Sequence, residues 1–336
     1  MQVMSSLPEP VMLEAIGSPP LHSAYTSFLS AKLLGSDWWF FGSDLKTVQS
    51  SFARRFLNFV IAFVMRGFVF PHFDKEYEAL LPEAYKPFAS ERKRNPDLGL
   101  VLAVEGLYPA VPLPHNAKVV FPAFKQQLSP DEQRFSKELE WFYSLNERVV
   151  LVAFGSAMYP TNATMKVICE LVQLKKDYAF LLAIKDAKRY FSPEVNDLLE
   201  QARQRPNVFI TDWLPQPAVL AHNKTKLFIT HGGANSFFEA VEAKVPLLVL
   251  PLEATDQAFT CEAVRLKGLG NCVFKPNSVA KLASAFEEIE QSGFYQARLE
   301  VLSRVVKKKS KQKEDLFYWI DYLFEVGAEH LQHKEY

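Results

Sequence analysis

The second half of the chain carries the most regular pattern of hydrophobic positions. Short uninterrupted apolar runs start at Val149, Ala179, Val208, Leu227 and Val245, and stretches with helical spacing of apolar residues separate them. Uninterrupted apolar strands belong to parallel sheets that helices cover on both faces. The pattern therefore predicts a doubly wound α/β domain in this half of the chain.

The first half is less regular and is interrupted by prolines. Short strands are predicted at residues 97–104 and 118–124, and the helical stretches that precede them end at Pro-rich breaks. A helix is predicted to start at Ser129, because a serine, a proline and two acidic residues follow one another there. Residues 279–332 are predicted to be helical.

The most membrane-like segment is Phe56–Met65, a short apolar run between two arginines. A membrane-spanning helix needs about 20 apolar residues, so this run is too short to span. It is interpreted as a buried helix, with an amphipathic helix in peripheral membrane contact as the alternative. Met1–Pro20 lacks the pattern of a signal peptide, so the default expectation is a cytoplasmic protein.

The net charge bears on the possible partners, and the cysteine spacing bears on metal and redox sites. The chain has 38 basic and 38 acidic residues, and its formal net charge is zero. No overall field then favours nucleic acid, which is excluded as a default partner. Cys169, Cys261 and Cys272 have no metal-binding or redox spacing and are expected to be free thiols of the core.

The stretch FITHGGANSFFEA, residues 228–240, joins an apolar strand to a helical pattern through two glycines. Gly232 and Gly233 let backbone amides approach a ligand closely, and the N-terminus of the following helix favours negative charge. His231 can add a hydrogen bond or a positive charge. The stretch predicts a site for a phosphate or diphosphate.

Each of these residues also has a purely structural interpretation. Asn235 or Ser236 could be the N-cap of the helix, and Ser236 with Glu239 fits a capping box. His231 could be a structural histidine, and a tryptophan just before a Leu-Pro pair, as at Trp213, usually serves packing. Taken singly, none of these residues distinguishes a binding site from a helix start.

Three motifs in order are more specific than any of them alone. DWLPQPAVLAH (212–222), FITHGGANSFFEA (228–240) and VPLLVLPLEATDQ (245–257) resemble the donor-binding signature of the family 1 UDP-glycosyltransferases. The resemblance extends from about Asp97 to the C-terminus. It implies the GT-B fold: a partial N-terminal acceptor-side domain at residues 1–145, a Rossmann-like domain that binds the UDP-sugar at 146–290, and a C-terminal helical tail at 291–336.

The resemblance implies a role for each motif residue on the nucleoside side. Trp213 is expected to stack on the uracil ring, whose flat face suits an indole. Gln216 is expected to hydrogen-bond a ribose hydroxyl. Glu239, one turn into the helix, is expected to accept hydrogen bonds from the ribose diol.

The diphosphate is expected to bind at the glycine pair. The resemblance assigns it to His231 and the amides around Gly233, with Asn235 and Ser236 in support. Ser156, which follows the strand at residues 149–153, is expected to reach the same phosphates. A helix dipole and these donors can stabilise a departing diphosphate, so no metal and no further cofactor are expected.

Asp256 and Gln257 are expected to bind hydroxyls of the transferred sugar. The sequence departs from the family here, because one extra residue lies between Pro251 and Asp256. Lys244 and Thr260 also replace residues that are usual in the family. These departures fall on the sugar side of the site and leave the donor sugar undetermined.

The largest departure concerns catalysis. Family members carry a catalytic histidine near the N-terminus, which acts as a base on the acceptor hydroxyl and is oriented by an aspartate. The segments for both residues are expected to be missing, and neither His22, His72 nor His115 has a recognisable base context. The membrane helix that ends animal-type members is expected to be missing as well.

Two functions therefore remain open. The first is a UDP-sugar-dependent transferase that moves a hexose or hexuronate to a hydroxyl of a small lipophilic acceptor, with inversion. The second is a non-catalytic or partner-dependent protein that binds the UDP-sugar, with a second subunit supplying the missing part. A dinucleotide-binding oxidoreductase is disfavoured, because no G-x-G-x-x-G follows the strand that starts at Val149.

Overall fold

The fold is described from a computed structural model of the 336-residue chain. It describes residues 13–16, 53, 56, 98–108, 117–121, 134–155, 158–252, 255–312 and 314–327, without the side chains of 13–16, 255, 256 and 314. The chain divides into two compact units. Unit 1 comprises residues 1–105, 110–123 and 312–336, and unit 2 comprises residues 106–109 and 124–311.

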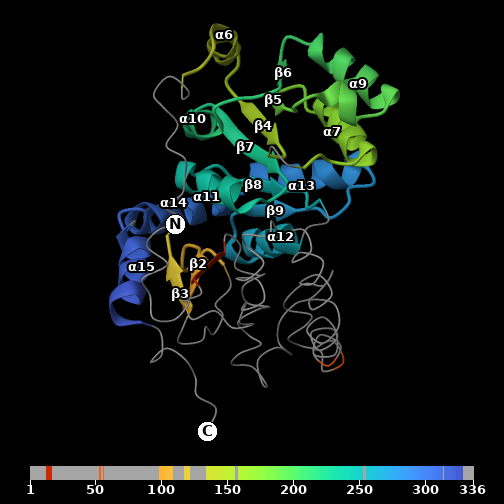
Figure 1. Ribbon diagram of the computed structural model, residues 1–336. Helices are drawn as coiled ribbons and strands as arrows, with labels where there is room; N and C mark the ends of the chain where they lie inside the picture. The colour runs from red at the N-terminus through yellow and green to blue at the C-terminus, as the bar shows by residue number, and fades with distance from the viewer. Residues whose placement is uncertain are drawn as a thin grey trace. The chain divides into compact units, whose positions relative to one another are not determined.

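The described residues of unit 1 include a small parallel sheet and helix α15 (Figure 1). Its strands β1 (Leu13–Ile16), β2 (Leu98–Leu102) and β3 (Ala117–Val120) lie in the order β1-β2-β3. Helix α15 (Glu314–Val326) contributes Leu316 and Leu323 to a core with Leu98, Leu100 and Val120. The strands expected at 97–104 and 118–124 are confirmed at 98–102 and 117–120, while residues 122–124 lie outside the described part of the chain.

Unit 2 is built on a six-stranded parallel sheet in the order β6-β5-β4-β7-β8-β9. The strands are β4 (Val149–Ala153), β5 (Ala179–Ala183), β6 (Val208–Thr211), β7 (Thr225–Thr230), β8 (Leu247–Val249) and β9 (Gly270–Cys272). Each apolar run of the sequence becomes a strand, which confirms the doubly wound α/β prediction.

Helices connect the strands of unit 2 and cover the sheet (Figure 1). They are α6 (Lys137–Leu145), α7 (Asn162–Leu174), α8 (Ala187–Tyr190), α9 (Pro193–Arg203), α10 (Gln216–Ala221), α11 (Ala234–Ala243), α12 (Thr255–Lys267), α13 (Val279–Gln291) and α14 (Gly293–Lys309). Val150 and Val152 of β4 pack with Ile168 of α7 and Phe286 of α13 in the main core. Burial of such side chains is the main stabilising term of the unit.

The strand order creates a topological switch point. The chain runs outward from β4 through β5 to β6 and then returns to β7, on the other side of β4. In open sheets of this kind, ligands bind outside the carboxyl ends of the strands at the switch point. A ligand site is therefore expected at the segments that follow Ala153 and Thr230.

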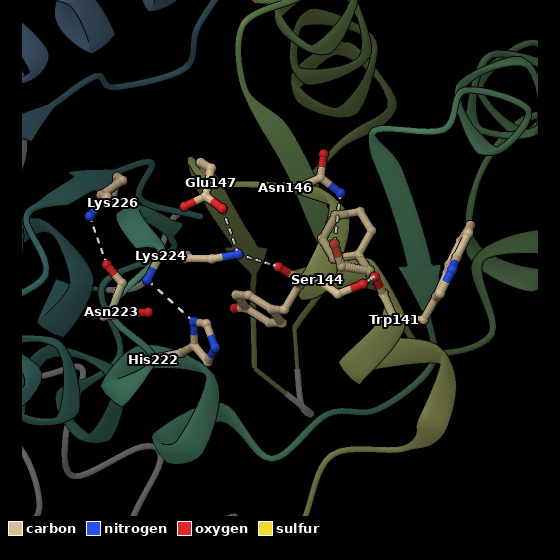
Figure 2. A network of polar contacts seen from close by, with 10 residues as sticks. Trp141, Ser144, Asn146, Glu147, His222, Asn223, Lys224 and Lys226 are labelled. Carbon is tan, nitrogen blue, oxygen red and sulfur yellow. Dashed lines mark hydrogen bonds and ion pairs between the residues drawn. The ribbon is translucent and has the colours of Figure 1, made fainter.

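The amino ends of β4 and β7 are held by a polar network with α6 (Figure 2). The hydroxyl of Tyr143 lies 2.8 Å from Oγ1 of Thr225, which donates at 2.6 Å to the carbonyl of Val219. Nζ of Lys224 donates to the carbonyl of Tyr143 at 2.7 Å and pairs with Glu147 at 2.8 Å. Helix α6 is thereby fixed at the amino ends of the strands, opposite the loops of the switch point.

Two sequence expectations need correction. The helix expected from Ser129 is not continuous through this stretch: residues 134–136 are not helical, and α6 begins at Lys137, where Oγ of Ser136 accepts from the amide of Leu139 at 3.2 Å. Ser129 itself lies outside the described residues. Cys261 of α12 and Cys272 of β9 form a disulfide with a Cα–Cα distance of 5.5 Å. The expectation of free thiols is correct only for Cys169, which is buried and free.

The membrane-like segment Phe56–Met65 lies outside the described residues except for Phe56, whose side chain is exposed. Across the described parts of the chain, no helix combines the length and the apolar character needed to cross a bilayer. The domain boundaries expected after residues 145 and 290 stay predictions.

Candidate functional site

The imidazole of His231 lies against two glycines at the switch point. A Cβ built on Gly155, after β4, would lie 3.1 Å from Cε1 of His231. A Cβ built on Gly233 would lie 2.6 Å from Nε2 of the same ring. The ring therefore occupies space that a side chain at either position would claim. The two glycines therefore make room for the His231 ring itself.

Gly232 is fixed by both conformation and packing. Its φ of +89° lies in the left-handed region, which favours glycine. A Cβ there would come within 2.8 Å of Cγ1 of Val249, the last residue of β8. The turn after β7 thus approaches β8 too closely for any side chain, and its backbone is held in one place.

Helix α11 starts directly after this turn, and no side chain caps it. Its N-cap is Gly233, with φ −60° and ψ 144°, so the interpretation of Asn235 or Ser236 as the N-cap is wrong. The first amides of a helix have no partner within the helix, and its N-terminus carries partial positive charge. Asn235 is exposed at this end, while the side chain of Ser236 is buried.

Three of the predicted residues meet in one hydrogen-bonded cluster. Nε2 of Gln216, at the start of α10, donates to Oε2 of Glu239 at 2.8 Å and to Oγ of Ser236 at 3.1 Å. The Glu239 carboxylate thus contacts α10, and the predicted capping box does not apply, because Ser236 lies within α11 and is not its N-cap. One carboxylate oxygen and the Gln216 amide lie side by side, an arrangement suited to a vicinal diol.

Trp213 stands on the loop after β6 with 61% of its surface exposed. Oγ1 of Thr211 donates to the Trp213 carbonyl at 3.0 Å, which fixes the backbone of the loop. The amide of Asp186 donates to Oδ1 of Asp212 at 3.1 Å and joins the loops after β5 and β6. An indole this exposed does not serve core packing, so that alternative for Trp213 is wrong.

An open hollow of about 520 Å³ lies beside these loops. Its lining combines Thr211 and Asp212 with the cationic side chains of Lys188, Arg189 and Arg203. The hollow opens at the carboxyl ends of β5 and β6, on the Trp213 side of the switch point. The size and mixed charge of this space are compatible with a polar ring system and its substituents.

The two residues expected to bind the sugar, Asp256 and Gln257, are not seen to join the Gln216–Glu239 cluster. Gln257 is 2% exposed: its Oε1 accepts from the Leu252 amide at 2.6 Å, and its Nε2 donates to Sδ of Met158 at 2.9 Å. Asp256 lies in α12, but its side chain is outside the described set, as is the whole of Ser156. The structure brings His231, Gly233, Gln216, Ser236 and Glu239 to one edge, and their contacts with a ligand stay predictions.

An aromatic pair at the same edge was not anticipated from the sequence. Tyr159, after β4, and Tyr190, at the end of α8, have ring centroids 3.7 Å apart and nearly parallel planes. Burial, followed by a hydrogen bond to Tyr190, raises the pKa of Tyr159. No motif joins two tyrosines 31 positions apart, and only the adjacency of β4 and β5 in the sheet brings them together.

The comparisons with known proteins agree with this geometry. The family model described as UDP-glucoronosyl and UDP-glucosyl transferase matches residues 45–335. The chain belongs to this family. Among the described residues, no three His, Cys, Asp or Glu side chains form a group that could hold a metal ion.

Relatives and solved structures of the family match the chain in part. A putative UDP-glucuronosyltransferase of Caenorhabditis elegans is 32% identical over 51% of this chain and 32% of its own length. UDP-glucuronosyltransferase 3A1 of Xenopus laevis is 27% identical over 80% of this chain and 50% of its own length. The chain thus spans half or less of both curated relatives.

The fold is shared with solved GT-B glycosyltransferases. The crystal structure of a UDP-glucose:anthocyanidin 3-O-glucosyltransferase in complex with UDP superposes with a TM-score of 0.54 at 19% identity. The alignment covers 67% of this chain and 53% of that one. At this identity the likeness establishes a common fold, which confirms the GT-B prediction for the family 1 UDP-glycosyltransferase type.

Proposed function

We propose that unit 2 binds a UDP-sugar at the carboxyl edge of its sheet and that the protein transfers the hexose or hexuronate to a hydroxyl of a small lipophilic acceptor. The observation that carries the proposal is the uncapped start of α11 beside His231. A diphosphate there would receive backbone amides, the helix dipole and an imidazole nitrogen. The Gln216–Glu239 pair contacts the same helix and would bind the ribose, and the exposed indole of Trp213, three residues before Gln216, would stack on the base.

The proposed reaction inverts the anomeric carbon. A base removes the proton of the acceptor hydroxyl, whose oxygen forms a bond to the anomeric carbon while the bond to the diphosphate oxygen breaks. The electron pair of that bond goes to UDP, and the start of α11 with His231 stabilises the new negative charge. No metal is needed for this step. His22, His72 and His115, the histidines of the N-terminal part, lie outside the described residues, so no base is assigned.

A donor-binding role without transfer by the isolated chain is the second candidate. The donor-side residues that the structure brings together, Gln216, Ser236 and Glu239 beside the start of α11, would be sufficient for this role. A partner subunit would then supply the acceptor side. The Cys261–Cys272 disulfide favours a location in an oxidising compartment, because disulfides rarely persist in the cytoplasm. This location would replace the cytoplasmic one that the sequence suggested by default.

The test is a calorimetric titration of UDP into the wild type and two tryptophan variants. Trp213 and Trp141 are 61% and 60% exposed, which makes Trp141→Ala a matched control for Trp213→Ala. Base stacking contributes about 1–3 kcal/mol, so Trp213→Ala should weaken UDP binding roughly 10- to 100-fold. Trp141→Ala should leave it unchanged. Absence of UDP binding by the wild type would overturn the proposal.

A second assay separates the two candidates. Release of UDP from a UDP-sugar in the presence of lipophilic alcohols measures transfer. Turnover above background by the isolated chain supports the transferase. Tight UDP binding with background turnover supports the donor-binding protein that needs a partner.

A further inference from the structure

Gln257 is almost completely enclosed by protein, although it corresponds to the last residue of the donor motif. Only 2% of its surface is exposed. Its Oε1 accepts a 2.6 Å hydrogen bond from the amide of Leu252, and its Nε2 donates to Sδ of Met158 at 2.9 Å. Both ends of the amide are therefore engaged by the chain itself, and a sugar hydroxyl would have to displace one of them.

The partners of Gln257 come from three neighbouring strands. Leu252 follows β8, and Met158 follows β4. The backbone oxygen of Gln257 lies 3.4 Å from the position that a Cβ of Gly232, after β7, would occupy. Since β4, β7 and β8 are adjacent in the sheet, one side chain and its own backbone connect the loops on both sides of the turn that precedes α11.

We propose that Gln257 is a positioning residue, which holds the loops after β4 and β8 around the diphosphate turn, and that it does not bind the sugar directly. This inference rests on the proposed function. A buried amide without partners is costly, so the two hydrogen bonds define one geometry for both loops.

The two roles differ in which ligand they affect. A residue that contacts the sugar contributes to binding of the UDP-sugar and contributes nothing to UDP. A residue that positions the diphosphate turn contributes to both ligands by the same factor, because both carry the diphosphate. The ratio of the two affinities therefore separates sugar contact from positioning. Because partial unfolding would also weaken both ligands equally, urea unfolding must show that each variant is folded under the conditions of the titration.

The experiment titrates UDP and UDP-glucose into the wild type, Gln257→Met, Gln257→Glu and Met158→Leu. Gln257→Met keeps the side-chain length but loses both hydrogen bonds, and should weaken both ligands equally, by roughly tenfold. Met158→Leu removes only the sulfur acceptor and should weaken both by roughly threefold. In the double variant the losses should not add, because both changes break the same contact.

Hydrogen exchange at the Leu252 amide gives a readout that needs no ligand. The bond to Oε1 should protect this amide in the wild type and in Gln257→Glu, which keeps a carboxylate oxygen there, and Gln257→Met should expose it. Unchanged UDP affinity with weaker UDP-glucose binding in Gln257→Met would overturn the inference. If the wild type fails to bind UDP, the proposed function fails, and unaltered exchange at Leu252 in Gln257→Met would separately overturn the positioning role.

Discussion

The two ends of the β4–β7 strand pair use polar residues in opposite ways. At the amino end, Lys224 pairs with Glu147 (Figure 2) and donates to the carbonyl of Tyr143. The hydroxyl of Tyr143 bonds to Thr225, which donates to the carbonyl of Val219. At the carboxyl end, glycines bring an imidazole and an uncapped helix start to the surface. The polar groups of the first end bond to one another across three elements, whereas the second end combines internal hydrogen bonds with the backbone amides of a helix start that has no capping side chain at Gly233.

Polar residues at the amino ends of β4 and β5 are also bonded to one another. Arg148 pairs with Glu290 at 2.5 Å, hydrogen-bonds the hydroxyl of Tyr178, and places its guanidinium carbon 4.1 Å from the centroid of that ring. These residues line a second hollow of about 360 Å³. Although burial acts to raise the pKa of Glu290, hydrogen bonds from Tyr178 and Arg148 outweigh it and lower the pKa. Polar residues beside a hollow are thus insufficient evidence for a site.

Cutting the disulfide should give the largest effect on stability. The disulfide ties α12 to the carboxyl end of β9 and closes a loop with a sequence separation of 11. By the loop-entropy relation it stabilises the fold by about 3 kcal/mol, so Cys261→Ala with Cys272→Ala should lower the free energy of unfolding by that amount. Urea unfolding with and without reductant measures the change.

The free thiol Cys169 supplies the control for this experiment. Cys169→Ala should show the same sensitivity to reductant as the wild type, because the disulfide is intact in both. A wild-type midpoint in urea that does not move when reductant is added would contradict the bond.

Gly233→Ala should weaken UDP binding roughly 30-fold, or about 2 kcal/mol. Its Cβ would lie 2.6 Å from Nε2 of His231, so the ring must move away and its charge-assisted hydrogen bond to a phosphate is lost. Calorimetry measures the affinity, and urea unfolding checks that the fold persists.

Gly293→Ala is the matched control, because a Cβ there meets nothing within 4 Å. It should bind UDP as the wild type does. If the Gly233 and Gly293 variants bound UDP equally well, the diphosphate would not bind at the start of α11. The proposed functional difference between the amino and carboxyl ends of the strands would then be wrong.

Tyr143→Phe should change stability and leave UDP binding alone. The hydroxyl is buried, burial raises its pKa to about 12, and its loss removes the bond to Thr225. Thr225 still donates to Val219, so the cost should be about 1 kcal/mol. The exposed Tyr318→Phe is the control and should unfold at the wild-type urea concentration. A loss of UDP affinity in Tyr143→Phe would mean that the two ends are coupled.

The sequence was sufficient for those features that depend on local pattern. Apolar runs predict strands because burial on two faces demands them, and the glycine pair predicts a backbone approach because only glycine tolerates it. These arguments located β4 to β8 and the start of α11. They also indicated the family, since its motifs lie at the strand ends.

Features that depend on packing were beyond the sequence. The Cys261–Cys272 bond needs α12 to lie beside β9, and the spacing of the two cysteines carries no motif. Glu239 fits a capping box by spacing, yet Gln216 from α10 takes its carboxylate instead. The environment of Gln257 is set by the relative positions of the loops after β4, β7 and β8, which the sequence does not give. Each of these contacts joins side chains from different elements or loops, and no local spacing pattern predicts it.

The smallest expected effect is a pH dependence of stability at the amino end. His222 lies 4.0 Å from Tyr143, ring to ring, and its Nδ1 accepts from the Lys224 amide at 3.2 Å. Burial, then the charges of Lys224 and Lys226, lower its pKa below the usual value of about 6.5. The unfolded chain therefore binds this proton more readily than the folded one.

Stability from this residue is fully present above about pH 6.5 and is lost as the pH falls toward the lowered pKa of the folded state. His222→Phe keeps an aromatic ring beside Tyr143 but cannot be protonated, so its urea midpoint should fall less steeply between about pH 7 and 5.5 than that of the wild type. Parallel pH profiles of the two proteins would show that His222 does not titrate differently on folding. Because His222 stands at the amino end, UDP affinity at pH 7 should be the same in both, which would separate the stabilising end of the strand pair from the binding end.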